Sequence, residues 1–290
     1  MTQSEDEAPR MVMFAGPNGS GKSTVTAALL HTEALRDIFY INADDIANEL
    51  FGHVRDDVER NTRAAEVAEI LRRDALDHGQ AFAFETLGST VGKLAFIDEA
   101  REQGFQVDLF VVTTADPTIN VQRVANRVSH GGHPIAPDKV IERWHRVMAL
   151  LPAAFLKADT ATVFDNSAEG RAPALVAEKS DDKTSFEMRP RPWVQKYLIA
   201  PLRVRQSSRE HLAGKLPKGS LLRDAETGDG HTYRGALVHE TDVHLLQRLS
   251  RSMVYVLHDK ALCLAGEYTL GDRAVIRYSY GEDGKHLRHR

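Results

Sequence analysis

The residues with the clearest chemical signature form a glycine-rich run near the start of the sequence. The nine residues are Gly16, Pro17, Asn18, Gly19, Ser20, Gly21, Lys22, Ser23 and Thr24. They meet every fixed position of the phosphate-binding pattern G-x-x-x-x-G-K-[ST]. In such a loop the backbone N–H groups surround an anion, the lysine contacts the β- and γ-phosphates, and the hydroxyl after it holds Mg²⁺. We therefore expect this loop to bind ATP, with Lys22 on the phosphates and Ser23 on Mg²⁺.

The sequence on either side of this loop fits the same interpretation. Residues 11–15 form an apolar run typical of a buried strand, and residues 25–30 can continue a helix. A strand, a glycine loop and a helix start together form an anion site, because the helix N-terminus adds positive potential. The alternative, a glycine-rich surface loop that arises by chance, explains neither the strand nor the helix.

Carboxylates follow the second predicted strand, residues 37–42. Asp44 and Asp45 come directly after it. In open α/β sheets ligands bind beyond the carboxyl ends of the strands, so these side chains face the nucleotide. One carboxylate can take the proton of an attacking hydroxyl. The alternative role is to cap the helix expected over 46–51. We assign the chemistry to Asp44 and the cap to Asp45.

The third predicted strand, residues 80–85, also ends in a carboxylate. Glu85 is followed by Thr86, and a hydrogen-bond acceptor beside a hydroxyl suits a polyol or amide substrate. Ser89 and Thr90 are interpreted instead as caps of a helix over 91–103.

Two basic helices are predicted after the fourth strand. The first starts at Pro117 and carries Arg123 and Arg127 on one face, four residues apart. The second carries Arg143, and Gly131-Gly132-His133 lies between them as a hinge. This pattern predicts a lid whose arginines stabilise charge on a phosphoryl group in transfer. The alternative, surface salt bridging, applies to at least half of the basic residues there.

The repeated alternation of strands and helices fixes the predicted fold class. Strands are expected at residues 11–15, 37–42, 80–85, 105–114 and 160–164. This alternation predicts an α/β domain over 1–180, with a five-stranded parallel sheet flanked by helices. Residues 181–204 turn polar and are predicted to be a linker. Residues 205–290 are predicted to form a small, mostly β domain with a short helix over 242–249.

Charge is distributed unevenly along the 290 residues. Residues 1–180 hold 18 Lys and Arg against 27 Asp and Glu, a net charge of −9, and residues 181–290 hold 19 against 14, a net charge of +5. The basic half is either an ordinary solvated surface or a weak nucleic-acid contact. No apolar run reaches the roughly 20 residues of a membrane span. With Cys263 as the single cysteine, we expect a cytoplasmic protein without an intrachain disulfide.

These motifs, taken in order over about residues 10–170, resemble the zeta-toxin family of toxin–antitoxin kinases, and its short chromosomal relatives most closely. The resemblance implies a P-loop kinase that uses ATP and Mg²⁺ to phosphorylate the sugar 3′-hydroxyl of UDP-N-acetylglucosamine. It implies that Asp44 is the general base, Lys22 the phosphate-loop lysine, Glu85 a substrate-binding carboxylate and Arg123 a lid arginine. Other residues that match the family less closely are Thr86, Arg127 and Arg143.

The sequence departs from that family at two places. The segment after Glu85 is Thr86-Leu87-Gly88 in place of a short glycine-bearing turn, and His133 stands where others carry arginine. Both departures bear on the phosphate acceptor rather than on the kinase chemistry.

The C-terminal part is similar to the KfrB-type domain of plasmid accessory and mobilisation proteins. The residues that carry this likeness lie at 233–235, 240–247 and 256–260. The likeness implies a mobile-element context without a mechanism.

The sequence thus predicts an ATP-dependent kinase of a small molecule, and several alternatives remain open. The acceptor can be an antibiotic, NAD or the 5′-hydroxyl of RNA in place of the sugar nucleotide. A protein of another class, a nucleotide-gated and DNA-associated plasmid maintenance factor, would bind ATP without transferring phosphate. An antitoxin protein is an expected partner, and residues 205–290 could instead restrain the kinase in cis.

Overall fold

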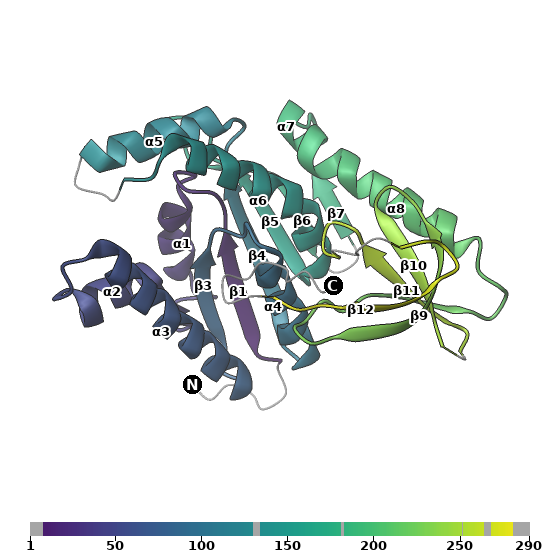
Figure 1. The fold of residues 1–290 in the computed structure, drawn as a ribbon. Helices are drawn as coiled ribbons and strands as arrows, with labels where there is room; N and C mark the ends of the chain where they lie inside the picture. The colour runs from purple at the N-terminus through teal and green to yellow at the C-terminus, as the bar shows by residue number, and fades with distance from the viewer. Residues whose placement is uncertain (1–7, 130–133, 181–182, 251, 264–267, 281–290) are drawn as a thin grey trace. The chain divides into compact units, whose positions relative to one another are not determined.

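The computed structural model describes residues 8–129, 134–180, 183–250, 252–263 and 268–280. The chain divides into two compact units (Figure 1). The first unit comprises Met1–Gly88, Ala100–His145 and Ala158–Met188, and the second comprises Ser89–Glu99, Arg146–Lys157 and Arg189–Arg290. Two long helices therefore contribute residues to both units.

Strands and helices alternate through the first 165 residues, as the sequence predicts. The elements are β1 (Arg10–Ala15), α1 (Lys22–Leu30), β2 (Phe39–Ile41), α2 (Ala43–Phe51), α3 (Asp57–Asp77), β3 (Phe82–Thr86), α4 (Val91–Glu102), β4 (Gln106–Thr113), α5 (Pro117–Ser129), α6 (Pro137–Lys157) and β5 (Thr160–Asp165). Two further strands follow, β6 (Ala174–Ser180) and β7 (Lys183–Phe186).

The first unit is built on one sheet in the order β2-β3-β1-β4-β5-β6-β7. The first five strands of this order pair in parallel, which confirms the predicted α/β class. The expected strand count of five is wrong for the described residues, because β6 and β7 extend the sheet by antiparallel pairing. β7 lies in the stretch 181–204, so that stretch is not an unstructured linker.

The core of the first unit surrounds β1, which carries the phosphate loop at its end. Residues Met11 to Ala15 are all buried, as a parallel strand covered on both faces requires. Phe14 stacks on Phe110 with ring centroids 5.3 Å apart, and Val12 packs in the same cluster as Leu35. The loop therefore leaves a strand that is fixed by close packing.

The start of α2 differs from the prediction. The helix begins at Ala43 and its N-cap is Asn42, whose Oδ1 accepts the N–H of Asp44 at 2.9 Å. The predicted cap at Asp45 is wrong, because the N-cap lies three residues earlier, at Asn42. Both aspartates lie in its first turn, where negative charge suits the helix dipole.

The ends of two other helices are defined by local signals. The Asp56 side chain caps α3 by accepting the N–H of Glu59 at 2.8 Å, and Gly79 follows the helix with φ +64°. α5 begins at Pro117, as the sequence predicts. The predicted hinge Gly131-Gly132-His133 lies outside the described residues.

The second unit contains a helical run and a separate sheet. Its own elements are α7 (Pro192–Val194), the π-helical turn η1 (Gln195–Ile199), α8 (Ala200–Ala213), β8 (Leu221–Asp224), β9 (Thr232–Glu240), β10 (His244–Leu249), β11 (Val254–Asp259) and β12 (Arg273–Arg277). The strand order is β12-β9-β10-β11-β8, and only β8 pairs in parallel. The β-rich prediction is confirmed, but the short helix expected over 242–249 is wrong, since β10 occupies it.

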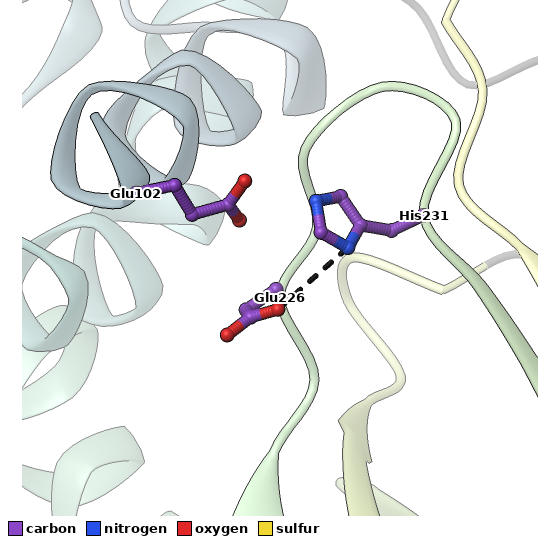
Figure 2. A group of neighbouring side chains, drawn as sticks. All are labelled: Glu102, Glu226 and His231. Carbon is purple, nitrogen blue, oxygen red and sulfur yellow. Dashed lines mark ion pairs between the residues drawn. The ribbon is translucent and has the colours of Figure 1, made fainter.

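The core of this second sheet combines apolar and polar side chains. Leu237, Leu245 and Val256 pack in one cluster with Tyr278. His258 is fully buried in the same sheet. At the surface, His231 Nδ1 lies 3.7 Å from Glu226 Oε2 (Figure 2), an exposed pair of the kind that contributes little to stability. Within the described residues, no helix has the length and apolar character to cross a membrane.

Candidate active site

The candidate site lies where the parallel strands of the first unit end. In register, Ala15 of β1 is opposite Thr86 of β3 and Val111 of β4, and Thr113 of β4 is opposite Asp165 of β5. The carboxyl ends of neighbouring parallel strands therefore flank the glycine loop on both sides. This is the edge of an open α/β sheet at which ligands bind.

Two glycines of the loop are required by close contacts. Gly21 has φ +83°, and a Cβ atom there would lie 2.2 Å from Asn166 Nδ2. A Cβ atom at Gly16 would lie 2.1 Å from the backbone oxygen of Val112. Any side chain at either position would force the loop away from the strand ends, so glycine is needed for the backbone to lie there.

Two asparagines brace the loop from neighbouring elements. Asn120 of α5 is buried and donates from Nδ2 to the backbone oxygen of Asn18 at 2.6 Å. Asn166, after β5, donates from Nδ2 to the backbone oxygen of Ser20 at 2.8 Å. These contacts occupy loop carbonyls and so fix the loop backbone. Sequence reasoning missed both roles, and the only available signal was the position of Asn166 at a strand end.

Lys22, Ser23 and Glu85 meet at the start of α1. Ser23 Oγ donates to Glu85 Oε2 at 3.0 Å, and Lys22 Nζ lies 3.8 Å from the same oxygen. Burial lowers the pKa of Lys22, the charges of Glu85 and Asp44 oppose that shift, and the charge of Arg127 adds to it. The structure thus brings together a lysine, a hydroxyl and a carboxylate, although Glu85 lies 62 residues after Ser23 in the sequence.

Tyr40 and Asn42, at the end of β2, extend this cluster. Tyr40 donates its hydroxyl hydrogen to Glu85 Oε1 at 3.1 Å, and Asn42 donates from Nδ2 to the Tyr40 oxygen at 3.2 Å. Burial, followed by the charge of Glu85, raises the pKa of Tyr40. Sequence reasoning gave neither residue a role, although both stand beside the strand end at which Asp44 was singled out.

Asp44 and Asp45 are both exposed in the first turn of α2. The Asp44 charge raises the pKa of Lys22 against the larger effect of burial, so this carboxylate lies within electrostatic reach of the loop lysine. The pKa of Asp45 is raised by burial first and then by the charges of Glu49, Asp44 and Glu85. Asp45 therefore interacts electrostatically with the other carboxylates of the site, in addition to its place in the first turn of α2.

The three predicted arginines differ in their contacts. Arg123 donates from NH1 to the backbone oxygen of Asn166 at 2.7 Å. Arg143 donates from NH1 to Asn18 Oδ1 at 3.1 Å. Arg127 is exposed, and its charge lowers the pKa of Lys22. All three lie around the loop. Thr86 Oγ1 accepts the N–H of Gly88 at 3.3 Å, which shapes the turn after β3.

The residues present suit a magnesium nucleotide. The loop glycines let the backbone lie close against the strand ends, and α1 begins at Lys22, so its first N–H groups can bind an anion. The Ser23 hydroxyl and the Glu85 carboxylate supply adjacent oxygen donors, which Mg²⁺ prefers. The site therefore combines an anion-binding loop with neighbouring oxygen ligands for a cation.

Family comparisons agree with this geometry. Residues 11–151 match the family model described as AAA domain, and residues 232–286 match that of the KfrB domain. The first match covers the loop, the carboxylates and the arginines described above, so the candidate site lies within it. Below, "AAA domain" is used for residues 11–151, the segment that this family model matches.

Similar solved structures show the fold of the AAA domain. The AvrRxo1-ORF1:-ORF2 complex with ATP aligns with a TM-score of 0.50 at 17% identity, over 63% of this chain. The chain spans 62% of the length of that protein. The PezAT toxin–antitoxin system of Streptococcus pneumoniae aligns with a TM-score of 0.48 at 16% identity, over 73% of this chain and 89% of that one. The likeness to the AvrRxo1-ORF1:-ORF2 complex shows the fold of this segment, a mostly parallel sheet flanked by helices.

A relative of similar size to the AAA domain occurs in Haemophilus influenzae. This uncharacterized protein is 29% identical over 140 residues, which is 47% of this chain and 92% of the relative.

Proposed function

We propose that the AAA domain is an ATP-dependent phosphotransferase that acts on the hydroxyl of a small molecule. One observation carries the proposal: the loop lysine, the loop hydroxyl and Glu85 meet at the sheet edge, and the charge of Asp44 reaches the same lysine. A nucleotide switch needs the phosphate loop and ligands for Mg²⁺. It has no use for a further carboxylate such as Asp44, whose charge reaches the loop lysine. A carboxylate in that place suits the removal of a proton from an acceptor.

In the proposed reaction, the acceptor oxygen forms a bond to the γ-phosphorus while the bond to the β–γ bridging oxygen breaks. Asp44 accepts the proton of the acceptor hydroxyl. Lys22 and the loop N–H groups hold the phosphates, and Arg127 stabilises the charge that spreads over the transferred group. Bound at Ser23, Mg²⁺ would neutralise charge on the leaving phosphates. Because ATP and the acceptor are bound side by side, the transfer proceeds as a step within one complex, which lowers its entropic cost.

We propose the sugar 3′-hydroxyl of UDP-N-acetylglucosamine as the acceptor, with Glu85, Thr86 and Arg143 on its binding side. The support for this acceptor is the resemblance of the motifs to zeta toxins. On the same support we propose an antitoxin protein as a partner, with restraint in cis or weak nucleic-acid contact by residues 205–290 as the alternatives. A cytoplasmic location fits the need for ATP and a sugar nucleotide.

Substitution of the two central residues tests the reaction. We expect Asp44→Ala and Lys22→Ala each to lower phosphate transfer by at least about 10²-fold, because one removes the proton acceptor and the other a phosphate contact. The matched control is Asp37→Ala, whose carboxylate is 91% exposed and pairs only with the neighbouring Arg36 in the described residues. The measurement is transfer from labelled ATP to a panel that contains UDP-N-acetylglucosamine, NAD, aminoglycosides and 5′-hydroxyl RNA.

The outcomes separate the competing functions. A labelled sugar nucleotide would support the proposed acceptor. Label on another compound of the panel would support the kinase activity but identify a different acceptor. Full transfer by the Asp44→Ala protein would remove the proposed base. Slow ATP hydrolysis with no labelled acceptor would favour the nucleotide-gated plasmid maintenance factor.

A further inference from the structure

Glu85 is held at both of its carboxylate oxygens. Oε2 accepts from Ser23 Oγ at 3.0 Å, and Oε1 accepts from the Tyr40 hydroxyl at 3.1 Å. The side chain of Glu85 is only 13% exposed. The phosphate loop is therefore connected to the end of β2 through a single carboxylate.

The direction of these hydrogen bonds follows from the groups involved. An ionised carboxylate only accepts, so both hydroxyls must donate to Glu85. Asn42 Nδ2 donates in turn to the Tyr40 oxygen at 3.2 Å, which leaves the phenol hydrogen directed at Glu85. Because Tyr40 occupies Oε1, the carboxylate cannot rotate freely, and Oε2 stays on Ser23.

The Ser23 hydroxyl keeps its oxygen lone pairs available in this arrangement. Its hydrogen is given to Glu85, so a cation bound at the serine oxygen would leave that hydrogen bond in place. Glu85 Oε2 would then lie beside the cation as a negative charge, with an orientation already set. Outer groups that orient a ligand carboxylate tune metal affinity in this way.

We propose that Tyr40 is a positioning residue that fixes Glu85 on the cation side of the site, so that Glu85 serves Mg²⁺ binding. This inference rests on the proposed phosphotransferase and revises one part of it, because Glu85, placed above on the acceptor by the family resemblance, is here assigned to Mg²⁺. Tyr40 itself contacts neither nucleotide nor acceptor in this scheme. The alternative is that the Tyr40 hydroxyl merely satisfies a half-buried carboxylate.

Calorimetric titration with ATP, in excess MgCl₂ or in EDTA, separates these two roles without any turnover. The quantity of interest is the ratio of the two affinities, which is the gain that Mg²⁺ gives to ATP binding. For Tyr40→Phe we expect this gain to fall about 10-fold while the affinity in EDTA changes less than about twofold. For Glu85→Gln we expect a fall of about 10- to 100-fold in the gain.

Glu85→Gln should also change the affinity for ATP in opposite directions with and without Mg²⁺. In EDTA the affinity for ATP should rise, because a negative charge beside the phosphates has been removed. Loss of folding cannot produce weaker binding with Mg²⁺ and tighter binding without it. In the Glu85→Gln protein, adding Tyr40→Phe should change neither affinity, because the carboxylate that Tyr40 orients is gone.

The matched control is Tyr197→Phe, which removes a phenol hydroxyl from the second unit and should leave both affinities unchanged. An equal loss in both buffers, or no loss, for Tyr40→Phe would overturn the inference while ATP binding by the unaltered protein still supports the proposed function. No ATP binding by the unaltered protein in either buffer would overturn both.

Discussion

A single glycine decides whether two strands of the second unit can pair. Gly235 of β9 lies opposite Leu249 of β10, and a Cβ atom there would lie 1.9 Å from the backbone oxygen of Arg248. The neighbour that must move is backbone, so no side-chain rotation relieves the contact. Gly235, which belongs to the KfrB-like motif, is therefore needed for β9 and β10 to pair at this position.

We expect Gly235→Ala to destabilise the second unit by about 1–3 kcal/mol, the usual cost of forcing atoms into a packed site. Native-state hydrogen exchange of the β9 and β10 amides measures this loss of stability. Gly214→Ala is the matched control, since Gly214 has φ −64° and a Cβ atom there meets nothing closer than 3.5 Å. Equal protection of β9 and β10 in the two variants would contradict the requirement for glycine.

The sequence identified the residues of the site that belong to a local pattern. Lys22 and Ser23 follow from the loop motif, and Glu85 follows from its place at a strand end. Tyr40, Asn120 and Asn166 could not be found in this way, because each acts through a contact with a distant segment. Asn120, for example, is 102 residues from the loop carbonyl that it binds.

At the scale of elements, α5 presents two arginines with different surroundings. Arg123 is half-buried and bonded to the backbone oxygen of Asn166, whose side chain braces the phosphate loop. Arg127, one turn later, is exposed and acts on Lys22 through its charge. The helix therefore holds one arginine against the scaffold and leaves the next one exposed, within electrostatic reach of Lys22.

We expect Arg127→Ala to lower the rate of phosphate transfer by about 10²- to 10³-fold, as the loss of a transition-state donor does, with an unchanged melting temperature. Arg123→Ala should lower the melting temperature by several degrees and weaken ATP binding, because the loop loses part of its support. Steady-state kinetics and thermal unfolding of both variants give the comparison. Equal effects on rate and stability in the two proteins would refute this division of roles.

The elements that sequence reasoning missed share a physical cause. β7 is short, and three of its four residues are exposed, so it carries no hydrophobic alternation. β10 buries His244 and Gln247, and Gln247 Nε2 donates to the backbone oxygens of Gly235 and Ala274 at 3.2 and 2.9 Å. Polar residues that are buried by cross-strand hydrogen bonds hide the period of a strand. The five parallel strands, whose buried side chains are mostly apolar, were predictable.

At the scale of the whole molecule, the two units are held by different kinds of core. Around β1 the first unit buries apolar side chains. The second unit adds a buried polar group, in which His258 Nδ1 lies 2.9 Å from the Tyr278 hydroxyl and Nε2 lies 3.2 Å from Gln247 Oε1. Because the Gln247 amide nitrogen is used by two carbonyls, its oxygen faces the ring, and His258 must carry its hydrogen on Nε2 and accept at Nδ1.

This neutral histidine makes the second unit sensitive to acid. Burial lowers the pKa of His258 to about 3, whereas an unfolded histidine titrates near 6.5. Between these values the unfolded state binds a proton that the folded state does not, so stability falls as the pH falls. The slope is about 1.4 kcal/mol per pH unit for one such group, and about 2 kcal/mol is lost between pH 7.5 and 5.0. Burial also lowers the pKa of His244, which acts in the same direction.

Hydrogen exchange of β10 and β11, corrected for the intrinsic effect of pH, measures this loss. We expect protection in these strands to fall with the predicted slope below pH 6.5. A His258→Gln protein should be less stable at pH 7.5, since Tyr278 loses its acceptor, but its stability should depend less on pH because the titrating ring is gone. His244 remains in both proteins, so the difference between their slopes isolates His258. Parallel slopes would show that His258 is not the group that senses acid.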